Sequence, residues 1–133
     1  MPVFAVLSLI VVLSSMGLPG LNGFVGEFTI LLGSMGAPSL APTAWIYTAF
    51  ATSGVILAAV YLLWMFQRVF LGPVTNEDTK KLRDLNRREL AIMLAFVLFI
   101  FWIGIAPSGY FGLMDTSVSQ LVSDISSSVV AMP

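Results

Sequence analysis

The first 67 residues of the chain carry a single charged side chain, Glu27. A stretch of that length and composition does not form a water-soluble surface, because soluble domains cover much of their surface with charged residues. The whole chain has the same character, since 58% of its 133 residues are hydrophobic and only 10% are charged. We therefore predict an all-α, polytopic membrane protein, because a helix satisfies its own backbone hydrogen bonds in lipid.

Two uncharged runs have the length that a membrane crossing requires. The hydrocarbon core of a bilayer is about 30 Å thick and needs close to 20 helical residues. The run 44–67 meets this length and has aromatic residues near both ends, where they favour the membrane interface. The run 90–106 is shorter but still within the range of spanning helices. Between them, we expect 68–89 to be an aqueous loop, because it contains every Lys and Arg of the chain.

The segment 1–36 requires an interruption, because a continuous helix of this length would extend about 50 Å. Its centre, 17–23, reads Gly-Leu-Pro-Gly-Leu-Asn-Gly, and Pro19 has no backbone N–H with which to continue a helix. Two arrangements are compatible with this pattern: two spans joined by a tight turn, or one discontinuous span made of two half-helices. The flanking runs of about 12 to 14 residues are shorter than ordinary spans, which favours the discontinuous one.

The charge distribution predicts how the chain is oriented. Positively charged loops stay on the cytoplasmic side of a membrane, so the loop 68–89 is expected there. With three crossings, of which the first is discontinuous, the C-terminus lies outside. We expect a multi-pass protein of the cell inner (plasma) membrane.

The segment 113–131 follows the last crossing. Its apolar residues recur at helical spacing, which is typical of an amphipathic helix: Val118, Leu121, Val122, Ile125 and Val129. We expect a short external helix at the membrane interface, with a frayed tail as the alternative, because its Ser-rich face supports a helix weakly.

Glu27 is the main candidate for chemistry. An ionised carboxylate is costly in hydrocarbon, so a glutamate within a membrane usually faces protein or water and often marks an ion or proton path. Burial favours its neutral form, which suits a group that takes up and releases protons. Asn22, in the break, is a weaker candidate for holding water or backbone groups. The alternative is that Glu27 only pairs with a Lys or hydroxyl of another helix, or lies at headgroup depth.

The composition argues against other functions. The chain has no His and no Cys, so the usual zinc, haem and thiol sites are not expected, and we predict no metal-binding or cofactor-binding residue in this chain. Its net charge of -1 gives no reason to expect a nucleic-acid partner.

Four stretches together resemble a known family: SSMGLPGLNGFVGEFTILLGSM, GVILAAVYLLWMFQRVFLGPV, NRREL and FWIGIAP. They are similar to the C-terminal portion of the M-type antiporter-like subunit of bacterial respiratory complex I, the proton-translocating NADH:quinone oxidoreductase. In the sister L-type and N-type subunits and in related antiporters, Lys typically stands at the position matching Glu27.

This resemblance implies that the first span is discontinuous and that Glu27 belongs to a buried proton relay, at its outlet side. It also implies a subunit of a translocase without redox residues of its own. NADH, FMN, iron–sulfur clusters and quinone would then bind to other subunits of the complex, and the other membrane subunits would be the partners of this chain.

The chain departs from the family in its length. The other relay residues of the family lie upstream of any position in this sequence. We expect a fragment or truncated reading frame that needs the missing N-terminal helices of its own subunit, with a split-gene product or a non-functional remnant as alternatives. As other functions, a component of a multisubunit sodium/proton antiporter and a small structural membrane protein stay open.

Overall fold

A computed structural model describes residues 1–74 and 77–130 of the chain. The last residue of the expected tail, 131, lies outside the described residues, as do 75 and 76 in the charged loop. The elements are α1 (Pro2–Ser15), α2 (Asn22–Gly36), the 3-10 helix η1 (Pro38–Leu40), α3 (Ala44–Phe70), α4 (Glu77–Lys80), α5 (Arg87–Ile105) and α6 (Ser108–Val130). The described residues contain no strand, and the predicted all-α class is confirmed.

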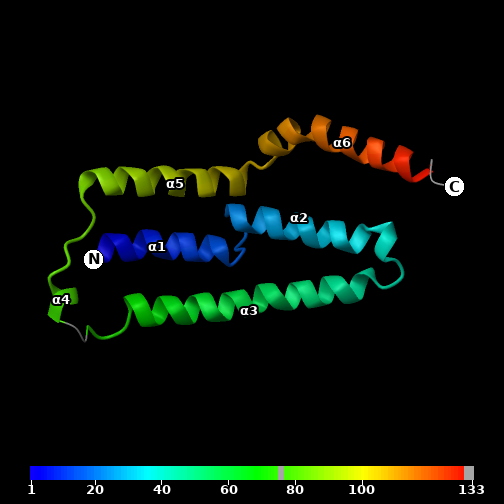
Figure 1. The fold of residues 1–133 in the computed structure, drawn as a ribbon. Coiled ribbons are helices and arrows are strands. Elements are labelled where there is room, and N and C mark those ends of the chain that lie inside the picture. Colours follow the sequence, from blue (N-terminus) through cyan, green and yellow to red (C-terminus); the bar gives the residue numbers. More distant parts are fainter. Residues whose placement is uncertain (75–76, 131–133) are drawn as a thin grey trace.

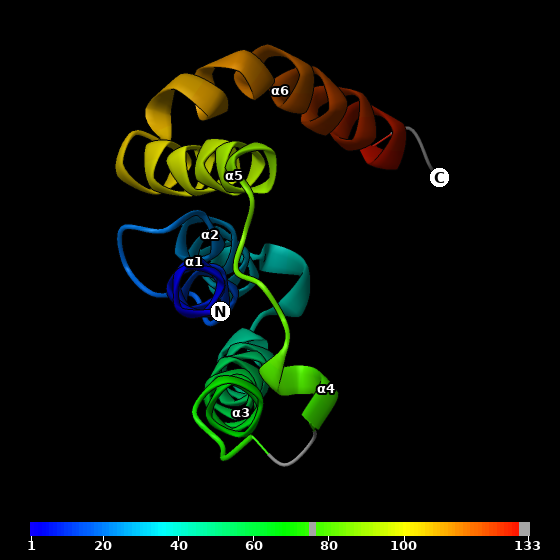
Figure 2. The same ribbon diagram turned by 90° about the vertical axis from the view of Figure 1, so that its left-hand side faces the viewer.

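The helices form a flat row. Figures 1 and 2 show α1 and α2 in the middle, with α3 on one side and α5 on the other, and both outer helices contact both middle ones. α1, α2 and α5 run in one direction and α3 runs in the opposite direction (Figure 1). The fold therefore places the junction of α1 and α2 between two long neighbouring helices.

α1 and α2 follow one another in the same direction and do not fold back as a hairpin (Figure 1). They contain 14 and 15 residues and so have a summed helical length of about 43 Å. The 27-residue α3 alone is about 40 Å long. The two half-helices together thus match one long span, and the discontinuous arrangement that the sequence favoured is the one observed.

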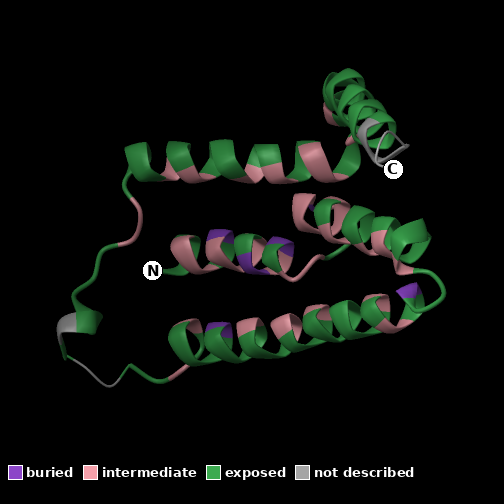
Figure 3. Ribbon diagram, turned by 45° about the vertical axis from the view of Figure 1, so that its right-hand side comes forward, coloured by how far each residue is buried: buried purple, intermediate pink, exposed green. Residues whose placement is uncertain are grey.

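The outer surface of the row is apolar. Both α3 and α5 are long and apolar enough to cross a membrane. Only 6% of the most apolar 18-residue stretch of each helix is buried within the described chain. Most of each helix is exposed or intermediate in burial (Figure 3). Few of the described hydrophobic residues are buried: Leu7, Val12, Leu21, Ala44 and Phe66. A soluble protein would bury its most apolar helices, so this distribution fits a protein whose solvent is lipid.

The ends of the charged loop differ from the predicted 68–89. α3 continues to Phe70, because Arg68 in its last turn suits the negative end of the helix dipole and the Phe66 and Phe70 rings stack at 4.8 Å. α5 begins earlier than 90, at Arg87, because the Asn86 side chain caps it. Helix ends depend on such local bonds, which hydropathy does not report.

The tail is helical from Ser108, earlier than the predicted start at 113. The Pro107 carbonyl accepts hydrogen bonds from the amides of Tyr110 and Phe111 at 3.0 and 3.1 Å, which begins the helix directly after α5. Its apolar residues are more than half exposed: Val118, Leu121, Val122 and Ile125. α6 is therefore the predicted amphipathic helix, and it extends away from the row of the other helices (Figure 2).

Candidate functional site

The junction between α1 and α2 begins with a Schellman motif, a hydrogen-bonded turn that closes a helix with one residue in the left-handed conformation. Gly17 is that residue, with a φ of +70°. Its amide donates to the Ser14 carbonyl at 3.1 Å, and the Leu18 amide donates to the Leu13 carbonyl at 3.3 Å. Pro19 follows and prevents the helix from continuing. The sequence break is thus a defined turn.

The chain resumes its helical conformation within the predicted break, 17–23. Gly20 has a φ of +90°, and Leu21 is extended and stands at the N-cap of α2. α2 therefore begins at Asn22 and not after Gly23, because two left-handed glycines are enough to redirect the chain.

Two further glycines let the backbones around this junction approach closely. A Cβ atom on Gly23 would collide with the Ser14 carbonyl oxygen at the end of α1. A Cβ atom on Gly104 of α5 would lie 2.5 Å from the Gly20 carbonyl carbon and 2.6 Å from that of Leu21. The backbone of α5 thus rests directly on the junction. Sequence reasoning missed Gly104, since nothing in a helical run identifies the partner of one glycine.

A side-chain hydrogen bond connects the two half-helices across the break. The Ser14 hydroxyl donates to Oδ1 of Asn22. Ser14 is only 5% exposed, so this bond satisfies a buried polar group that would otherwise be costly. Asn22 was predicted to support the break, and the structure places it there, while Ser14 is its unpredicted partner.

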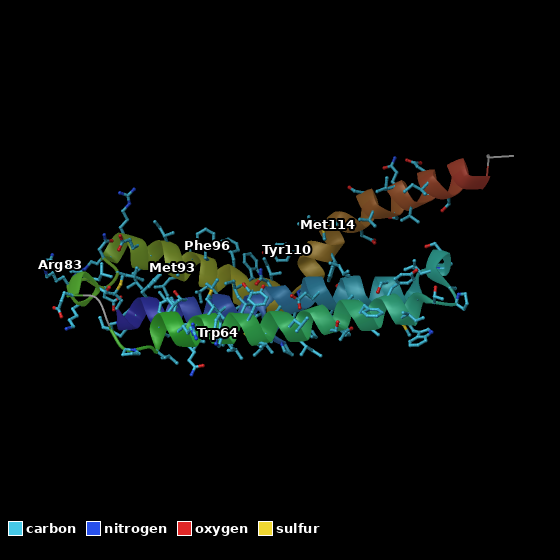
Figure 4. The ribbon with its side chains drawn as sticks, turned by 60° about the horizontal axis from the view of Figure 1, so that its bottom comes forward. Trp64, Arg83, Met93, Phe96, Tyr110 and Met114 are labelled. Atoms are coloured by element: carbon cyan, nitrogen blue, oxygen red, sulfur yellow. The ribbon has the colours of Figure 1, made fainter. Side chains whose placement is uncertain are left out.

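Asn22 also lines two hollows. One has a volume of about 520 Å³ and is lined by apolar side chains of α1, α3 and α5, among them Met93 and Phe96 (Figure 4), with Ser8 as its other polar residue. The other has a volume of about 340 Å³ and includes Tyr110 and Met114 at the start of α6. Asn22 is therefore a lining residue of both pockets.

Glu27 lies in α2, slightly more than one turn after Asn22, and its carboxylate packs against the Schellman turn. A Cβ atom on Gly17 would lie 3.0 Å from Cδ of Glu27 and still closer to Oε2. The glycine therefore serves two purposes, since it adopts the left-handed conformation and leaves room for the carboxylate. Glu27 and the break, which the sequence placed near each other along the chain, are in direct contact.

The Glu27 carboxylate has no hydrogen-bonding or ionic partner among residues 1–74 and 77–130. Glu27 is intermediate in burial within the described residues, and its carboxylate lies against the turn at Gly17. Across the described part of the chain, no group of three His, Cys, Asp or Glu residues gathers. An isolated carboxylate can exchange a proton, whereas a divalent cation usually requires several oxygen ligands.

Comparison with known proteins places this geometry in context. No family model matches the chain. NADH-ubiquinone oxidoreductase chain 4 of Marchantia polymorpha is 41% identical over 122 residues, which is 92% of this chain and 23% of the relative. NADH-quinone oxidoreductase subunit M of Rhodobacter capsulatus is 39% identical over 124 residues, or 93% and 23% of the two chains. The chain is homologous to part of subunit M.

The resemblance to the C-terminal portion of subunit M, drawn from the sequence motifs, is thereby confirmed. Subunit M of Rickettsia felis is similar to the chain at 38% identity over 122 residues. The chain spans less than a quarter of the length of the Marchantia and Rhodobacter relatives. The similarity extends over more than nine tenths of this chain.

Proposed function

We propose that the chain forms part of the proton-translocating membrane arm of an NADH:quinone oxidoreductase, and that Glu27 carries protons within it. The observation that carries this proposal is the contact of the Glu27 carboxylate with the unwound turn at Gly17, in the middle of a discontinuous helix. The subunit M relatives support the same complex and favour it over a sodium/proton antiporter.

The break gives Glu27 the surroundings that a proton carrier requires. Unwound backbone within a membrane provides polar groups and space for water at the same depth. In this proposal, Asn22 binds and orients water in the pockets that it lines. The Ser14 hydroxyl bonds to the side-chain oxygen of Asn22, which leaves the side-chain NH2 of Asn22 to donate to that water.

The chain supplies no redox group in this proposal. NADH, FMN, iron–sulfur clusters and quinone bind to other subunits of the complex, which fits a chain without Cys or His. The partners of the chain are the other membrane subunits, the remaining helices of its own subunit and the lipid bilayer.

We place the charged loop on the cytoplasmic side of the inner membrane and α6 along the external surface. The concentration of every Lys and Arg in this loop supports the cytoplasmic side. Hydrogen bonds from the amides of Val3 and Phe4 to Asp84 put the start of α1 beside the same loop. The guanidinium of Arg68 lies 4.1 Å from the centre of the Trp64 ring, at the loop end of α3 (Figure 4). Such a pair anchors a helix at a membrane interface.

The test is Glu27→Gln in the assembled membrane complex. Gln has nearly the same shape and cannot ionise, so we expect several-fold lower proton pumping per electron transferred, with normal assembly. Glu77→Gln in α4 is the matched control, because Glu77 is an exposed residue of the loop and its change should leave pumping intact. Pumping is measured in membrane vesicles with a pH-sensitive dye, and assembly by native gel electrophoresis.

Normal pumping by an assembled Glu27→Gln complex would contradict the proposal. A complex that is lost with Glu27→Ala but pumps normally with Glu27→Gln would instead assign Glu27 a packing role.

A further inference from the structure

The start of α1 is capped by a residue that is far away in the sequence. Asp84 lies in the loop between α4 and α5. Its Oδ2 accepts a hydrogen bond from the Val3 amide at 2.8 Å, and its Oδ1 accepts one from the Phe4 amide at 3.2 Å. The Leu85 amide also donates to Oδ1 at 2.9 Å, which fixes the orientation of the carboxylate.

The Asp84 carboxylate suits the start of α1. The first amides of a helix have no carbonyl to bond within the helix. Pro2 stands in the first turn without an N–H, and Asp84 accepts hydrogen bonds from the next two amides, those of Val3 and Phe4. Its negative charge also suits the positive end of the helix dipole.

The same loop segment also starts α5. The Asn86 side chain accepts hydrogen bonds from the Arg88 and Glu89 amides, each at 2.9 Å, and the Glu89 carboxylate accepts one from the Asn86 amide. Residues 84–86 thus bind the first turns of α1 and α5 at one place. α1 and α5 run side by side from this point toward the break (Figure 1).

α5 meets the break again at its other end, where Gly104 rests on Gly20. The discontinuous span is therefore attached to α5 at two points, the Asp84 cap and the Gly104 contact. α1 is a stiff rod between them, so an axial shift at Val3 is transmitted to the Schellman turn at Gly17.

We propose that Asp84 is a positioning residue for the break. By fixing the axial position of α1 against α5, it sets where the Gly17 turn lies against the Glu27 carboxylate. This inference rests on the proposed function of Glu27. Asp84 lies in a loop at the end of the helices. The junction on which it would act begins at Gly17, about 14 residues, or roughly 21 Å, along α1 from Val3.

The test uses the assembled complex with Asp84→Ala, Asp84→Asn and, as a matched control, Asp124→Ala, which removes an exposed carboxylate from α6. Hydrogen–deuterium exchange is read at the Val3 and Phe4 amides, and protons pumped per electron are measured on the same membranes. We expect Asp84→Ala to speed exchange at both amides about threefold or more and to lower the pumping ratio. Asp84→Asn keeps one acceptor oxygen and should fall between Asp84→Ala and the unchanged chain.

An unchanged pumping ratio in Asp84→Ala and Asp84→Asn, together with faster amide exchange, would overturn the positioning role and leave a local cap. Unchanged exchange in both variants would overturn the cap itself. Glu27→Gln is measured in parallel. Normal pumping in Glu27→Gln would refute the proposed function. Reduced pumping in Glu27→Gln together with normal pumping in the Asp84 variants would refute only this inference. If Asp84→Ala prevents assembly, Asp84→Asn decides between these outcomes.

Discussion

At the scale of single residues, Gly17 is constrained in two ways at once. It has a left-handed φ of +70°, and its missing side chain leaves the space that the Glu27 carboxylate occupies. Most glycines of the helices show neither property. The identity of one residue thus determines both the path of the backbone and the place of the carboxylate.

We predict that Gly17→Ala destabilises the protein by about 2 kcal/mol, of which about 1 kcal/mol comes from the left-handed backbone and the rest from displacing Glu27. Thermal unfolding in detergent measures this difference. Gly54→Ala in α3 is the control, because its Cβ would meet open space in an ordinary helix, where Ala is favoured. Equal melting temperatures for the two variants would show that the turn does not require glycine.

At the scale of helices, the cap of α1 is sensitive to acid. Desolvation would raise the pKa of Asp84, but hydrogen bonds from the Val3, Leu85 and Phe4 amides and the positive amino terminus together lower it below the ordinary value of 3.8. Since the pKa is lower in the folded state, the cap contributes its full stability above pH 4. That contribution is lost as the pH falls through the lowered value.

We predict that protection of the Val3 and Phe4 amides from hydrogen exchange, corrected for intrinsic rates, decreases when the pH falls below about 4. Asp84→Asn should show no such change in this range, because an amide side chain does not titrate there. A decrease of the same size in Asp84→Asn would assign the effect to another acidic group.

The helices themselves could be predicted from the sequence, whereas most contacts between them could not. The break was predictable because Pro19 and its neighbouring glycines exclude a continuous helix, and Glu27 stood out as the one charge among 67 residues. The Asp84 cap joins positions 81 and 80 residues apart, and the Gly104 contact also connects distant segments. Hydropathy and spacing describe one segment at a time, so they do not report such pairs.

At the scale of the whole molecule, the row of helices has two distinct ends. The loop around Arg83 and the start of α1 lie at one end, and α6 begins near the break and runs toward the other end as it diverges from α2 (Figures 1 and 4). In the proposed topology, α5 is the one crossing between the Arg83 loop and α6, so the two lie on opposite sides of the membrane.

We predict that Arg83→Cys and Ser123→Cys react with a membrane-impermeant maleimide from opposite sides. The chain contains no cysteine, so each variant carries a single reactive thiol. Arg83→Cys should be labelled in inside-out vesicles, and Ser123→Cys in spheroplasts. Labelling of both from the same side would show that α5 does not cross the membrane and would refute the topology.

The discontinuous span also has a consequence for how this protein is made. α1 has 14 residues and α2 has 15, so neither half reaches the length at which the insertion machinery releases a helix into lipid by itself. We therefore expect the two halves to leave the translocation channel as one unit. The 27 uninterrupted residues of α3, synthesised directly afterwards, are long enough to partition into lipid independently. We expect insertion of the polar break to depend on this following helix.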